Sequence, residues 1–100
     1  MKSGYNIEWT DEALQNLDLI IAYLLNGWSE KILEKFAKKL DKRIITISRN
    51  PFTFPVSGIR KNVRRCVLSK QTTIYYEIKK DVVVILTLFD NRSDPNSLKI

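Results

Sequence analysis

The chain is 100 residues long and 44% of its residues are hydrophobic, which is enough for one small domain with a single core. Lysine and arginine outnumber aspartate and glutamate by 17 to 11, and the net charge of +6 suits either a polyanionic partner or a solvated lysine-rich surface. Histidine is absent, Cys66 is the single cysteine and the three glycines are isolated, so we expect no internal disulfide, no metal and no other cofactor.

The first 25 residues contain no segment that resembles a targeting signal. The start, MKSGYNIEW, lacks the apolar core of a signal peptide. The longest apolar run, LIIAYLL over residues 19–25, is too short to cross a bilayer. We therefore expect a soluble cytoplasmic protein with no membrane contact, and a single free thiol fits a reducing compartment.

A short strand and two amphipathic helices are predicted next. Tyr5, Ile7 and Trp9 alternate with polar residues, as in a half-buried strand. Thr10 and Ser29 can each cap a helix, and the short connection around residue 27 predicts an antiparallel hairpin. The apolar stripe of the first helix is Leu14, Leu17, Ile21, Leu24 and Trp28. The stripe of the second helix is Leu33, Phe36, Leu40, Ile44 and Ile47, opposite a solvated row of Lys31, Lys35, Lys38 and Lys42.

The second half of the chain predicts a loop followed by three strands. Pro51 and Pro55 exclude a regular helix over residues 49–58. Strands are predicted over residues 62–68, 72–79 and 81–89, and the short polar turns between them indicate an antiparallel meander. The third strand, DVVVILTLF, is apolar on both faces, so it should lie at the centre of the sheet.

These elements predict an α+β domain over residues 1–100 with the order β-α-α-β-β-β. The helical hairpin should pack on one face of a small, mainly antiparallel sheet, because two helices cover only one face. We call the other face the open face. We expect it to display Thr73, Tyr75, either Arg64 or Arg65, and Arg92 after the central strand. Phe52 and Phe54 should fill a gap at the edge of the domain.

This pattern resembles the RelE/ParE superfamily of toxins from type II toxin–antitoxin modules, over nearly the whole chain. The resemblance rests on IEWTDEALQNLDLIIAYL, the proline-containing loop, and IRKNVRRCVLSKQTTIYYEIKKDVVVILTLFDNRSDP. It implies the same fold, a function in growth inhibition and plasmid stabilisation, and a cognate antitoxin as partner. A homodimer or a hetero-oligomer with that antitoxin is compatible with it.

The resemblance implies one of two targets. RelE-like members are ribosome-dependent mRNA endoribonucleases, and ParE-like members poison DNA gyrase. The RNase branch implies a basic residue on the first meander strand, an arginine early in the second, an arginine after the third and a tyrosine near the C-terminus. Arg65 or Arg64 matches the first and Arg92 the third, but Thr73 and Leu98 stand at the other two places. The match therefore favours the ParE-like branch.

Two alternatives stay open from the residues. The chain could be a RelE-like RNase, or a non-toxic protein-binding module on the same fold. The candidate catalytic residues are Arg65 and Arg92, and the candidate target-binding residues are Arg64, Arg65, Tyr75 and Arg92. Arg92 could contact a phosphate or the target, or it could form a salt bridge with Asp90 or Asp94 that only fixes the turn.

Overall fold

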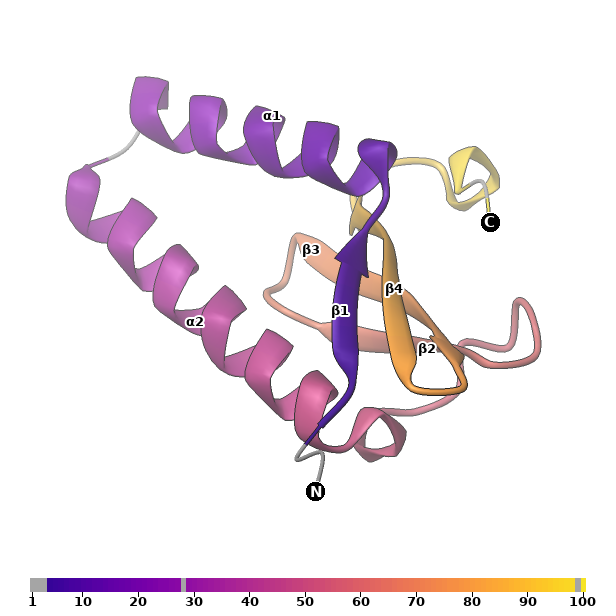
Figure 1. Ribbon diagram of the computed structural model, residues 1–100. Helices are drawn as coiled ribbons and strands as arrows, with labels where there is room; N and C mark the ends of the chain where they lie inside the picture. The colour runs from indigo at the N-terminus through magenta and orange to yellow at the C-terminus, as the bar shows by residue number, and fades with distance from the viewer. Residues whose placement is uncertain (1–3, 28, 99) are drawn as a thin grey trace.

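The computed structural model describes residues 4–27, 29–98 and 100 (Figure 1). The order is β1 (Asn6–Trp9), α1 (Asp11–Gly27), α2 (Glu30–Arg49), β2 (Val63–Val67), β3 (Thr72–Lys79) and β4 (Val82–Asp90). Short 3-10 helices cover Pro51–Thr53 and Pro95–Ser97. Two helices lie against a four-stranded mixed sheet, so the α+β class and the predicted element order are confirmed. Trp28 lies outside the described residues.

The sheet has the strand order β1-β4-β3-β2. β2, β3 and β4 form the predicted antiparallel meander, whereas β1 pairs in parallel with β4. β4 is therefore central, as its apolar sequence predicts. A register shift at Tyr75 and Tyr76 lets β3 follow the longer β4.

The core lies between the hairpin and one face of the sheet. From α2 it contains Leu40 and Ile47, and from the sheet it contains Cys66, Leu68, Ile74, Tyr76, Val83, Ile85 and Leu88. The predicted stripe of α2 is confirmed, but that of α1 is partly wrong. Leu14 is exposed, and Ala13 is the buried residue of the first turn. The Thr10 hydroxyl accepts a hydrogen bond from the Ala13 amide and donates one to Leu86 O, which turns Ala13 inward.

α1 also covers the free edge of β4. Pairing between β1 and β4 ends at Ile85, because β1 has four residues and β4 has nine. Beyond that point Asn16 of α1 takes the place of a strand. Its Oδ1 accepts hydrogen bonds from Leu88 N at 3.0 Å and from the Thr87 hydroxyl at 2.7 Å. Asn16 thereby provides a hydrogen-bond partner for the edge of β4 beyond the end of β1.

Under α2 the core includes two groups that can ionise. The Tyr76 hydroxyl donates a 2.6 Å hydrogen bond to Pro51 O. Burial raises the pKa of the Cys66 thiol from 9.0 to about 11, although the charge of nearby Arg43 opposes this shift. None of the helices within the described residues has the length and apolar character needed to span a membrane.

Candidate functional site

Arg92 lies in the turn after β4 and forms a bidentate ion pair with Asp90. Its Nε and Nη2 donate to the two carboxylate oxygens at 3.0 Å each, and its amide donates to Oδ1 at 2.9 Å. The Arg92 side chain remains 62% exposed. These hydrogen bonds lower the pKa of Asp90, and in return the carboxylate raises the pKa of the guanidinium, with a smaller contribution from the Tyr23 hydroxyl of α1. The turn therefore holds the guanidinium in one orientation at the surface.

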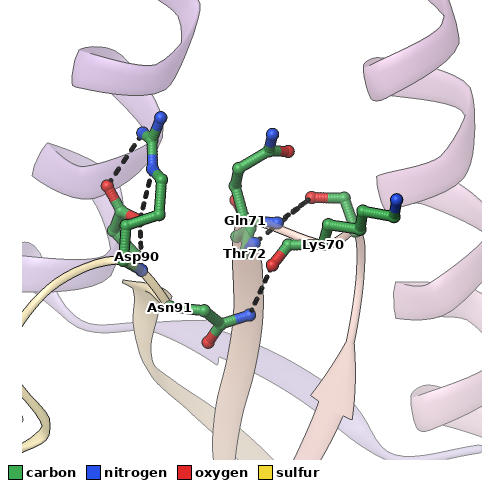
Figure 2. A network of polar contacts seen from close by, with 7 residues as sticks. Lys70, Gln71, Thr72, Asp90 and Asn91 are labelled. Carbon is green, nitrogen blue, oxygen red and sulfur yellow. Dashed lines mark hydrogen bonds and ion pairs between the residues drawn. The ribbon is translucent and has the colours of Figure 1, made fainter.

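Asn91 joins this turn to the turn between β2 and β3 (Figure 2). Its amide donates to Gln71 O at 2.7 Å, and its side-chain Nδ2 donates to Lys70 O at 3.2 Å. On the Lys70 side, the Ser69 hydroxyl accepts from the amides of Gln71 and Thr72. Hydrogen bonds join the two turns, and we call them together the turn cluster (residues 69–72 and 90–92). Arg92 therefore extends from a turn that two hydrogen bonds of Asn91 connect to the turn between β2 and β3.

Thr73 is not displayed on the open face as the sequence predicts. It lies in register between Val67 and Phe89, but only 4% of its surface is exposed. Its hydroxyl donates a 2.9 Å hydrogen bond to Asn91 Oδ1. Thr73 therefore stabilises the turn cluster through Asn91. Because it is buried, it cannot contact a target directly.

Arg65 and Tyr75 lie opposite each other on β2 and β3, on the open face. Arg65 is exposed, and Tyr75 is half-buried with its ring edge against Phe89 at a centroid distance of 6.3 Å. Asp90, which anchors Arg92, pairs with Thr72, three residues along β3 from Tyr75. That separation is about 10 Å. The two exposed arginines are therefore separate points on this side of the domain and do not form one compact cluster.

Arg64 turns the other way, because successive residues of a strand alternate between faces. Its Nη1 donates to Phe54 O at 2.8 Å and to Phe52 O at 3.3 Å. Its guanidinium lies 5.2 Å from the centre of the Phe52 ring. Arg64 thus binds the loop before β2. The register of β2 on β3 places Arg65, and not Arg64, on the open face. Phe54 packs against the core as expected, whereas Phe52 is exposed beneath Arg64.

Reasoning from sequence missed three residues of this region: Asn16, Tyr23 and Asn91. Each has a polar side chain next to an apolar segment, and many residues without a role share that feature. The sequence alone therefore does not distinguish them as functional. The described residues contain no group of three or more acidic, cysteine or histidine side chains placed to hold a metal ion.

Comparison with known proteins agrees with this architecture. The family of the ParE toxin of the type II toxin–antitoxin system parDE matches residues 7–95. No protein of curated function matches the sequence.

Solved structures share the fold at low sequence identity. One is from the chromosomal ParDE system of P. aeruginosa, with a TM-score of 0.72 and 16% identity over 89% of this chain and 98% of that chain. Another is from the E. coli DinJ–YafQ toxin–antitoxin complex, with a TM-score of 0.63 and 12% identity over 88% and 93%. A metal-bound toxin from Helicobacter pylori has a TM-score of 0.54 and 22% identity over 88% and 96%. With the family match over residues 7–95, this chain belongs to the ParE toxin family of type II toxin–antitoxin systems.

Proposed function

We propose that this toxin acts on DNA gyrase and is neutralised by a cognate antitoxin. The family match is the observation that carries the proposal, because ParE-like members are the gyrase-directed branch of the superfamily that the sequence resembles. The exposed guanidinium groups of Arg65 and Arg92 are the best candidates for contact with the target. Each can form a charge-assisted hydrogen bond with a phosphate or a carboxylate.

The region around the turn cluster supports a binding role better than RNA cleavage. Cleavage by the 2′-hydroxyl needs a base, a stabilised phosphate and an acid for the leaving oxygen. Thr73, which stands where the RNase branch implies an arginine, is buried and bonded to Asn91. The sequence contains no histidine to act as base or acid.

One observation favours mRNA cleavage as a second candidate. The Tyr23 hydroxyl of α1 adds a small contribution to the raised pKa of Arg92, so a phenol lies in the surroundings of this guanidinium. Such a pair can bind a phosphate and supply a proton to a leaving oxygen. Asp90 opposes this arrangement, because it already neutralises the charge of Arg92.

The decisive experiment compares both activities for the same purified protein. We expect the chain to inhibit supercoiling by purified gyrase, and to leave mRNA intact in a reconstituted translation reaction. Message cleavage on the ribosome without any effect on gyrase would replace the proposal by the second candidate. A protein that does not inhibit gyrase, does not cleave mRNA and does not arrest growth would contradict both candidate functions.

A further inference from the structure

A groove lies at the opposite end of β2 and β3 from the turn cluster. The chain between α2 and β2 forms it, and that chain protrudes beside the sheet in Figure 1. The groove has a volume of about 450 Å³. Its apolar lining includes Phe52, Val56 and Ile59, all three of them exposed. Its basic lining consists of Arg60, Lys61 and Arg64, and no acidic residue lines it within the described chain.

The groove is held in shape by contacts within the domain. Segment 55–57 pairs with β2 through Arg65 N to Pro55 O at 3.1 Å and Ser57 N to Val63 O at 2.9 Å. Arg64 fixes the Phe52 ring and its carbonyl, as described above. Arg60 forms a 3.0 Å ion pair with Glu77 of β3. The surface is therefore ready for a ligand without prior rearrangement, which reduces the entropic cost of binding.

The combination of exposed apolar side chains and positive charge restricts what can bind. Val56 is 64% exposed and Phe52 is 56% exposed, so burying both would release apolar surface from water. Arg60 is paired with Glu77, and Arg64 donates to the carbonyl oxygens of Phe52 and Phe54, so Lys61 is the basic lining residue that favours negative charge next to apolar side chains in the ligand. A second copy of this chain carries a net charge of +6 and supplies the wrong sign overall.

We infer that this groove binds an acidic segment of the cognate antitoxin, with apolar side chains of that segment on Phe52, Val56 and Ile59. The inference rests on the proposed function, in which an antitoxin neutralises the toxin. It adds a site and a ligand chemistry that lie apart from Arg65 and Arg92, so the antitoxin would hold the domain at a second place.

The test measures binding of a dye-labelled peptide in which glutamates alternate with leucines, using the full chain. A second peptide has lysines in place of the glutamates. We expect the acidic peptide to bind and the basic peptide not to bind. Lys61→Glu should weaken binding of the acidic peptide by at least about tenfold, because a charge-assisted contact becomes a repulsion. Lys70→Glu makes the same change of charge at the turn cluster and should have a much smaller effect.

Val56→Ser and Val67→Ser form a second matched pair, because Val67 is also exposed, at 51%, but does not line the groove. Only Val56→Ser should weaken binding. Equal effects of the two lysine variants would overturn the inference, since net charge alone would then explain binding. It would also be overturned by absent peptide binding, by preference for a single-stranded oligonucleotide, or by self-association that Val56→Ser abolishes.

Growth arrest in cells without an antitoxin tests the proposed function independently of peptide binding to the groove. Lys61→Glu should remain toxic when expressed alone. A toxic variant that still binds the acidic peptide as tightly as the unaltered chain contradicts only the groove. A chain that binds the peptide through the groove but neither arrests growth nor inhibits gyrase contradicts only the proposed function.

Discussion

At the scale of single residues, the two arginines of the RR pair in β2 have different roles. Arg64 holds the loop before β2 by hydrogen bonds, and Arg65 points to solvent on the open face. Arg92 combines both properties, since it is exposed but bonded to Asp90. A target that binds Arg92 must therefore compete with Asp90 or bind the remaining edge of the guanidinium.

Replacing Arg92 by alanine should reduce toxicity sharply and leave the melting temperature nearly unchanged. The ion pair with Asp90 is exposed, and such pairs contribute little to stability. Growth arrest and thermal melting are the measurements. Arg49→Ala removes an exposed arginine at the far end of α2 and should remain toxic. An Arg92→Ala protein that is fully toxic would show that Arg92 serves only the turn, and one that unfolds would show that it is structural.

Cys66 should give the protein a stability component that disappears at alkaline pH. Burial raises the thiol pKa from 9.0 to about 11, so the folded state retains a proton that the unfolded chain loses near pH 9. This component is complete below pH 9 and is lost as the pH rises towards 11. Denaturation from pH 7 to 11 measures it. Cys66→Ala should be less stable at pH 7 but should decline less steeply above pH 9, and parallel curves for the two proteins would contradict the assignment.

At the scale of secondary structure, α1 has two functions besides covering the core. Together with Thr10, the residue before it, α1 closes the edge of β4 through Asn16, and it contributes Tyr23 to the surroundings of Arg92. The short β1 explains the first function, because a four-residue strand cannot pair with the whole of β4. The position of the turn cluster thus depends on how α1 lies against β4.

Asn16→Ala should therefore destabilise the fold by about 1–3 kcal/mol, because it leaves the Leu88 amide and the Thr87 hydroxyl without this acceptor. Chemical denaturation measures the change. Asn26→Ala, an exposed position near the end of the same helix, has the same effect on helix propensity and should change stability by less than about 0.5 kcal/mol. Similar effects of both substitutions would mean that Asn16 does not close the edge.

At the scale of the whole molecule, the domain is thin and basic, with extents of 41 × 34 × 22 Å and a net charge of +6. Apolar side chains remain at the surface of the hairpin, among them Leu19, Tyr23 and Leu25. A large exposed apolar area in a small domain is typical of a surface that a partner covers. Both properties fit a toxin that an antitoxin wraps.

Association with the antitoxin should accordingly be fast and sensitive to salt. An acidic segment is steered by the positive field, and this field is screened as ionic strength rises. Stopped-flow mixing with the partner isolated by co-purification should show a falling association rate between about 0.05 and 0.5 M salt. The dissociation rate should change much less. An association rate that is independent of salt would rule out electrostatic steering.

The sequence by itself determined the fold class, the element order and the central place of β4. These features depend on local signals, such as apolar periodicity, short polar turns and the Thr10 cap, which lie within a few residues of one another. The third predicted strand, for example, is apolar on both faces, and that composition favours a place between two other strands over a place at the edge of the sheet. Ser29 stands at the predicted start of α2, but its side chain forms no capping hydrogen bond. The family was also apparent from these elements and their spacing.

Only the tertiary structure decided which side chains are available at the surface. Thr73 and Asn91 are 18 residues apart, and Thr87 and Asn16 are 71 residues apart, so no local pattern couples them. The choice between Arg64 and Arg65 followed from the register of β2 on β3, because a shift by one residue exchanges the two faces of a strand. The face of α1 that turns inward was likewise set by its docking on β4, which buries Ala13 and leaves Leu14 exposed.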